Sequence, residues 1–192
     1  MPAARSSEPK IYQLKIALER VSPPIWRRVL VLSTVPLSEL HTVIQTAMGW
    51  GDEHLHSFSK GAVTYGEDGS GKSEADVRLN KVLTAEGQSL TYLYDFGDSW
   101  RHKVTLEKIS PVEPGVKYPR LLDGKNRCPP EDCGGAGGYM RLLHILADPT
   151  HEEYEDWHDS DFDPKEFNLA RFQWRFNGGE PQRPAGQTAL DF

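Results

Sequence analysis

The sequence has few cysteines, no long apolar run and no excess of basic residues. Its 192 residues include two cysteines, and a chain of this length can bury a core without disulfide support. No apolar run approaches the length of a membrane span, and residues 1–9 lack the apolar centre of a secretory signal. We therefore expect a cytoplasmic protein in a reducing compartment, with no membrane association.

The formal net charge of −6 argues against a protein that coats nucleic acid by bulk charge. The acidity is concentrated in residues 148–166, where nine acidic side chains accompany Lys165, whereas the rest of the chain carries 21 basic and 19 acidic residues. A solvated face is the simple interpretation of this segment. A partner-binding surface and a cation site are the alternatives.

Hydrophobic periodicity predicts an α+β fold. Period-two or extended patterns predict strands over 10–18, 25–32, 54–58, 62–65, 90–96 and 100–109. Helical spacing predicts helices over 36–50, 76–83 and 139–147, and residues 162–176 are expected to form a last short helix and an extended end. Thr34 or Ser38 is expected to cap the first helix, Gly49 to end it, and Asp76 to cap the second. The order indicates a mixed or largely antiparallel sheet with flanking helices in a single domain.

Loop composition sets the expected domain limits. Residues 1–9 and the tail 177–192 are predicted to be disordered, which leaves one domain over 10–176. Residues 66–73 are rich in Gly and Ser and predict a loop. Residues 111–132 form a long, proline-rich connection, and a connection of that length is usually functional or packed as its own lobe.

The two cysteines flank a stiff segment, Cys128-Pro129-Pro130-Glu131-Asp132-Cys133. Four intervening residues lie within the spacing of zinc ligands. Zinc would need further ligands, for which His54, His56 and His102 are the candidates, with His54 and His56 two residues apart on one predicted strand face. Two reduced thiols, one local disulfide and a redox pair are the alternatives. The glycines that follow Cys133 lack the Lys-Ser/Thr ending of a phosphate-binding loop.

A polar hairpin, Tyr94-Asp95-Phe96-Gly97-Asp98-Ser99-Trp100-Arg101-His102, contains the Asp-Phe-Gly triplet of protein kinases. The chain is too short for a kinase and lacks the upstream His-Arg-Asp loop, so we reject that interpretation. Asp95 and Asp98 either accept hydrogen bonds from turn amides, with Gly97 at positive φ and Trp100 packed, or belong to a polar site. The candidates for that site are Asp95, Asp98, Trp100, His102, Glu131 and Asp132.

Basic and aromatic residues suggest a second kind of surface. Arg101 and Lys103 alternate onto one strand face, as phosphate-contacting residues would, while Arg27 and Arg28 point to opposite faces. Candidate nucleic-acid contacts are therefore Arg27, Arg28, Arg101 and Lys103. Trp50, Trp157 and Trp174 are candidates for exposed aromatic residues or for core.

Five motifs together resemble the plasmid pRiA4b ORF-3-like family. They are Pro23-Pro24-Ile25-Trp26-Arg27-Arg28; Leu40-His41 with Ala47-Met48-Gly49-Trp50; His54-Leu55-His56-Ser57-Phe58; the Tyr94–His102 hairpin; and Cys128–Gly135 with Gly138-Tyr139. The resemblance covers residues 11–176. It implies a bacterial or archaeal protein linked to plasmids or transposable elements, with some members called transposon passengers or putative resolvases. This sequence shows neither a recombinase constellation nor a helix-turn-helix with a basic recognition helix.

Two functions follow as hypotheses. The first is a non-catalytic accessory module that binds a protein or a nucleic acid. The second is a zinc-binding protein or metal-dependent hydrolase in which His54, His56, Asp98, His102, Cys128 and Cys133 share a pocket, with Asp95 or Glu131 as base. A thiol redox protein is a weaker third, because four intervening residues exceed the two of thioredoxin-type motifs. A site is expected where the His54/His56 strand, the Asp95–His102 hairpin and the Cys128–Cys133 loop meet.

Overall fold

Seven antiparallel strands form one sheet in the order β4-β3-β5-β6-β1-β2-β7. A computed structural model describes residues 8–66, 71–158 and 162–177. The elements in chain order are β1 (Lys10–Leu18), β2 (Trp26–Leu32), α1 (Leu37–Met48), β3 (His56–Lys60), β4 (Val63–Tyr65), α2 (Leu79–Val82), β5 (Ser89–Tyr94), β6 (Trp100–Pro111), β7 (Arg120–Lys125), α3 (Gly135–Ala147), α4 (Tyr154–His158) and α5 (Leu169–Phe176). This confirms the predicted α+β class and single domain.

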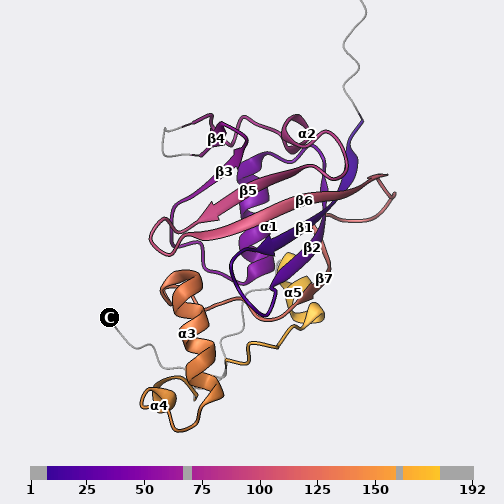
Figure 1. Ribbon diagram of the computed structural model, residues 1–192. Coiled ribbons are helices and arrows are strands. Elements are labelled where there is room, and N and C mark those ends of the chain that lie inside the picture. The colour runs from indigo at the N-terminus through magenta and orange to yellow at the C-terminus, as the bar shows by residue number, and fades with distance from the viewer. Residues whose placement is uncertain (1–7, 67–70, 159–161, 178–192) are drawn as a thin grey trace, which may run out of the picture.

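The core lies between the sheet and α1. Alternation along β1, β2 and β6 points Leu14, Ile16, Val29 and Val104 to the same face, where each is fully buried. Helix α1 covers that face with its apolar stripe, which includes Leu40 and Ile44 (Figure 1). The opposite face of the sheet has no helix over it in the part of the chain that the structure describes.

Helices α3, α4 and α5 lie at one end of the molecule. Figure 1 shows α3 and α4 beyond the end of the sheet and α5 beside β7. The side chain of Gln173 on α5 accepts a hydrogen bond from the Leu121 amide of β7 at 3.0 Å. Since β7 is an edge strand, α5 supplies the acceptor that a further strand would otherwise offer. No helix among the described residues is long and apolar enough to cross a membrane.

Strand β7 is a correction to the predicted connection over 111–132. Residues 120–125 pair antiparallel with β2, with Val29 opposite Leu121 and Arg27 opposite Gly124. Gly124 is required there, because a Cβ would lie 2.5 Å from the Phe167 ring and 2.9 Å from Arg27 Cδ. The strand therefore forms where β2 offers an unpaired edge and Arg27 needs room.

The predicted helix over 76–83 is also shorter than expected. Arg78 forms a β-bridge with Pro36, and the Leu37 amide donates to Val77 O at 3.0 Å. These bonds keep residues 77–78 extended, so α2 begins at Leu79 and Asp76 does not cap it.

The predicted N-terminal caps of α1 are absent as well, since Pro36 occupies its N-cap position without a side-chain bond. Gly49 ends α1 at φ +89°, as predicted.

Three smaller predictions need correction. Asp95 and Ser99, not Gly97, have positive φ in the β5–β6 turn. His54 precedes β3 instead of lying on it. The extended end expected near Phe176 is helical. The predicted disordered segments lie almost wholly outside the described residues.

Arg27 is the central side chain of this architecture. It is fully buried on β2, and no carboxylate lies within 4.0 Å of it among the described residues. Its guanidinium donates to Ala47 O at 2.9 Å, Trp26 O at 2.9 Å, Lys125 O at 3.0 Å and Cys128 Sγ at 3.3 Å. The guanidinium carbon also lies 4.7 Å from the Phe167 ring centroid. One cation therefore connects α1, β2, β7 and the cysteine loop.

Replacing Arg27 with Met should lower the free energy of unfolding by about 3 kcal/mol or more, because buried carbonyls lose their donors. Arg28→Met is the matched control on the open face. Arg28 pairs with Glu107 at 2.6 Å, and both side chains are partly exposed, so we expect a loss of about 1 kcal/mol or less. Urea denaturation followed by tryptophan fluorescence measures both, and equal losses would contradict the assigned role of Arg27.

Candidate functional site

The three segments predicted to form a site do meet. Glu131 in the cysteine loop accepts a hydrogen bond from the Gly51 amide at 2.7 Å and another from the Tyr94 hydroxyl at 2.6 Å. Asp98 in the β5–β6 turn accepts one from the Gly134 amide at 3.2 Å. The approach to β3, the hairpin and the cysteine loop are thereby joined at one junction.

His54 lies at the centre of this junction. Its Nε2 atom is 3.2 Å from Asp132 Oδ1 and 4.0 Å from Asp95 Oδ2. That nitrogen is buried and makes no hydrogen bond, even with Asp132. The three ligand atoms lie within 4.8 Å of one another. We call His54, Asp95 and Asp132 the junction triad.

The two oxygens of Asp95 have separate roles. Oδ1 accepts hydrogen bonds from the Gly97 amide at 2.8 Å and the Asp98 amide at 3.2 Å, as predicted for a turn aspartate. Oδ2 faces His54. Because the turn amides fix the carboxylate, its second oxygen is held in place before any ligand arrives.

The pKa values of Cys133 and Tyr94 are affected by the negative charge of this region. Burial, together with the negative charges of Asp98 and Asp132, raises the pKa of the half-buried Cys133 thiol to about 11. Burial also raises the pKa of Tyr94, and the Glu131 carboxylate adds to that shift. Both groups therefore keep their protons at neutral pH, and the junction favours a cation over an anion.

A second cluster lies beside the junction triad, and of its members the sequence analysis named only His56 as a candidate ligand. His41 on α1 contacts Asp52 at 2.7 Å, and His56 on β3 contacts the buried Glu74 at 3.0 Å. Both pairs and His54 line one cavity of about 320 Å³. The sequence could have indicated this cluster through His41, a polar residue beside the apolar stripe of α1. Asp52 and Glu74 belong to no sequence motif that would have indicated it.

Hydrogen bonds and ring stacking hold the side chains of the second cluster in place. Gln45 donates to the Tyr92 hydroxyl at 2.9 Å, and that hydroxyl lies 2.8 Å from His41 Nδ1. Burial and the neighbouring His56 lower the pKa of His41, so the ring is neutral at physiological pH. The His41 and His56 rings stack in parallel with centroids 3.5 Å apart. His41, Asp52 and His56 also offer three ligand atoms within 4.8 Å of one another, but the Nε2 atoms of His41 and His56 already contact Asp52 and Glu74.

The remaining predicted metal ligands are not brought to the junction triad. His102 is fully buried against Trp50 and donates from Nδ1 to Trp100 O at 3.1 Å, and burial lowers its pKa to about 4. Cys128 is buried and donates to Met48 Sδ at 3.2 Å. Cys133 is a separate free thiol. The five residues predicted as ligands, His54, His56, His102, Cys128 and Cys133, therefore do not share one pocket.

The predicted polar site divides in the same way. The residues Asp95, Asp98, Glu131 and Asp132 lie at the junction, whereas Trp100 and His102 are buried in the core.

The tryptophan predictions have separate outcomes. Trp50 belongs to the core: its ring stacks on Tyr94 with centroids 5.2 Å apart, and its Nε1 donates to Pro129 O at 2.9 Å. Trp157 is half-buried, and the side chain of Trp174 lies outside the described residues.

The predicted basic residues occupy both faces of the sheet. Arg27 is buried, where a phosphate cannot reach it. Arg28, Arg101 and Lys103 lie on the open face with Lys15 and Trp26. Acidic side chains neutralise part of that face, because Arg101 pairs with Glu19 at 3.2 Å and Arg28 with Glu107 at 2.6 Å.

The raised pKa of Cys133 predicts slow alkylation. In a Cys128→Ser background, the rate of reaction with iodoacetamide should rise with pH toward a midpoint near 11. Removing a neighbouring negative charge lowers the pKa of a thiol, so Asp98→Asn should increase the rate at pH 8, and Asp132→Asn should increase it less. A midpoint at the ordinary thiol value, unmoved by either substitution, would contradict this electrostatic picture.

Comparison with known proteins identifies the family. A family model described as plasmid pRiA4b ORF-3-like protein matches residues 10–171. The uncharacterized protein y4hQ of Sinorhizobium fredii is 39% identical over 171 residues, covering 84% of this chain and 88% of y4hQ. The crystal structure of MM3350 from Methanosarcina mazei Go1, a protein of unknown function, superimposes with a TM-score of 0.80 at 41% identity, covering 84% of this chain and 97% of that one. The chain belongs to the plasmid pRiA4b ORF-3-like family.

Proposed function

We propose that the protein is a binding module for a divalent metal ion, with zinc as the ion and the junction triad as its ligands. The observation that carries the proposal is the His54 Nε2 atom, which is buried, lacks a hydrogen bond and faces two carboxylate oxygens. A buried ring nitrogen that makes no hydrogen bond costs free energy unless something else binds it, and Asp132 Oδ1, although 3.2 Å away, does not form one. Zinc accepts one imidazole nitrogen and two carboxylate oxygens, and water completes an open site.

The electrostatics and accessibility of the junction support this proposal. Asp132 is well exposed, which gives the ion a path from solvent, while Asp95 is buried and fixed by the turn amides. Asp98 and Glu131 add negative charge around the triad. His54 supplies the nitrogen ligand that favours zinc over magnesium or calcium, since those ions select all-oxygen sites.

The proposal concerns binding and assigns no reaction to the site. A metal-dependent hydrolase would need a general base placed on a metal-bound water, and that activity stays a prediction. The plasmid- or mobile-element-associated accessory role also stays a prediction. Zinc binding is required for the hydrolase and is the property to measure first.

The first test is zinc titration of the untagged full chain after removal of metal with a chelator. We expect one equivalent to bind and the melting temperature to rise with zinc concentration. His54→Gln and Asp132→Asn should each weaken binding at least about tenfold. Asp132 has φ +57°, a conformation that Asn tolerates, so the second variant preserves the fold.

Three controls locate the ion. Cys128→Ser and Cys133→Ser should leave zinc affinity unchanged, because neither sulfur belongs to the group of ligand atoms that His54, Asp95 and Asp132 form, and His144→Gln on α3 should do the same. If His56→Gln failed to bind zinc while His54→Gln bound it fully, the ion would lie at the second cluster and the proposal would be overturned. Absence of stoichiometric zinc binding by the wild-type chain would do so as well.

The open sheet face supports a second candidate function, contact with single-stranded nucleic acid. Arg28, Arg101 and Lys103 share this face, and the Lys15 ammonium lies 5.2 Å from the Trp26 ring centroid. Lys103 is exposed and has no carboxylate within 4.0 Å among the described residues. Cations beside an aromatic ring on an open sheet provide phosphate contacts and a surface for stacking.

Charge reversal tests this second candidate. Lys103→Glu should weaken binding of a fluorescent oligonucleotide irrespective of its sequence. It should also reduce the slope of log affinity against log salt concentration by about one, the loss of one phosphate contact. Lys81→Glu on α2 is the control, since Lys81 is exposed away from the strands of this face. Equal binding by wild type, Lys103→Glu and Lys81→Glu would remove the candidate.

A further inference from the structure

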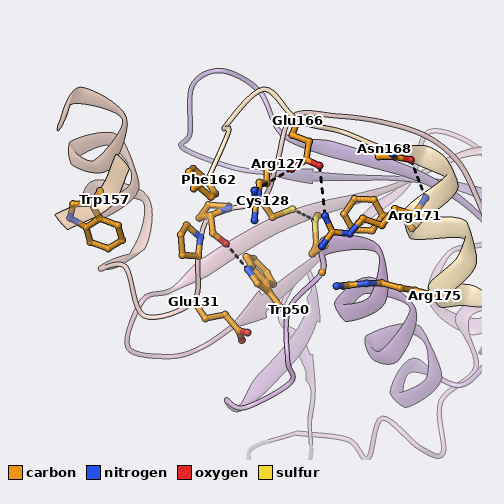
Figure 2. A pocket seen from close by; sticks show the side chains of 15 residues that line it. Trp50, Arg127, Cys128, Glu131, Trp157, Phe162, Glu166, Asn168, Arg171 and Arg175 are labelled. Carbon is orange, nitrogen blue, oxygen red and sulfur yellow. Dashed lines mark hydrogen bonds and ion pairs between the residues drawn. The ribbon is translucent and has the colours of Figure 1, made fainter. Parts of the chain in front are cut away.

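A separate cavity lies on the other side of the cysteine loop. It encloses about 350 Å³ and is lined by the end of α1, the residues from Arg127 to Glu131, and α4 and α5 (Figure 2). Glu131 borders it, but the carboxylate of Glu131 is already bonded to Gly51 and Tyr94 of the junction. The cavity and the junction triad therefore use different side chains.

Three arginines line this cavity, which we call the arginine pocket. Figure 2 shows Arg171 and Arg175 extending from α5 toward Trp50 and Cys128, with Arg127 on the facing loop. Glu166 pairs with Arg127 at 3.2 Å and with Arg171 at 3.7 Å. The two guanidiniums thus share one carboxylate.

Arg175 differs from the other two. No carboxylate lies within 4.0 Å of its guanidinium among the described residues, although the side chain is half-buried. The guanidinium carbon lies 5.7 Å from the Phe172 ring centroid, and Nη1 lies beside Gly49 at the end of α1. Burial and the nearby Arg171 lower the pKa of Arg175. An anion bound here would offset both the cost of burying the Arg175 charge and its repulsion from Arg171.

The charge of the pocket selects the kind of anion. Arg127 and Arg171 share the Glu166 carboxylate, and no carboxylate pairs with Arg175 among the described residues. The α5 side of the pocket is therefore positively charged, in a chain whose formal net charge is −6. A phosphate monoester carries close to two negative charges at neutral pH. Guanidiniums match phosphate oxygens with paired N–H donors.

We propose that the arginine pocket binds the phosphate monoester group of a small molecule. The volume lies at the lower end of the range for ligand pockets, which fits a compact ligand. Phe162, Phe172 and Trp50 provide apolar wall for the part that carries the phosphate. Arg171 and Arg175, four residues apart on one face of α5, contact the phosphate, and Arg127 approaches from the loop.

The test is calorimetric titration of the full chain in a chelator, so that zinc binding does not contribute. Inorganic phosphate, AMP and glucose 6-phosphate are the probes, and adenosine and glucose are the matched neutral compounds. We expect the phosphorylated probes to bind and the neutral ones not to. Tighter binding of AMP than of glucose 6-phosphate would identify a nucleotide as the source of the phosphate, and the reverse order a sugar phosphate.

Variants with opposite expected effects make the assignment specific. Arg175→Met should weaken binding of the phosphorylated probes at least about tenfold, whereas Glu166→Gln should strengthen it by removing the competing carboxylate. Arg141→Met is the control, because Arg141 pairs with Glu153 outside the pocket. A loss of affinity in Glu166→Gln, or equal binding by wild type and Arg175→Met, would overturn the proposal. Citrate binding as tightly as the phosphate monoesters would overturn the choice of phosphate.

Discussion

The buried guanidinium of Arg27 constrains the rest of this molecule. A cation removed from water is costly unless every donor finds an acceptor, and here the acceptors are three main-chain carbonyls and a sulfur from four different segments. Those segments must keep their positions for the cation to stay satisfied. The cysteine loop is one of them, and it separates the junction triad from the arginine pocket. The geometry of both sites therefore depends on a side chain that belongs to neither.

Strands with one buried face were predicted well. Strand β1 has the predicted limits, because the buried Tyr12, Leu14, Ile16 and Leu18 alternate with the less buried Gln13, Lys15 and Ala17, as a strand with one face in the core requires. Strand β7 was missed because Arg-Leu-Leu-Asp-Gly-Lys carries two adjacent leucines and a glycine and has no clear period. Its strand conformation comes from the edge of β2 and from the contact of Gly124 with Arg27 and Phe167, which are tertiary effects.

The candidate site shows the same division. The sequence placed His54, Asp95 and Asp132 among its candidates and predicted where the segments meet. It also grouped them with His102 and Cys128, which the structure places elsewhere, because the sequence does not resolve which way each side chain points. His102 lies on the buried face of β6, and Cys128 is directed toward Arg27. His41 lies on α1, Asp52 on the loop that follows it and Glu74 well beyond β4, so their approach in one cavity depends on the packing of α1 against the sheet.

Helix α5 joins two properties that would otherwise be independent. Gln173 bonds the free edge of β7, while Arg171 and Arg175 on the same eight-residue helix line the arginine pocket. Separation of α5 would expose a strand edge to pairing with a second chain. A ligand that binds only the docked helix lowers the population of that exposed state by mass action. Occupancy of the pocket would thus protect the protein from self-association, and the empty protein would be the species most prone to it.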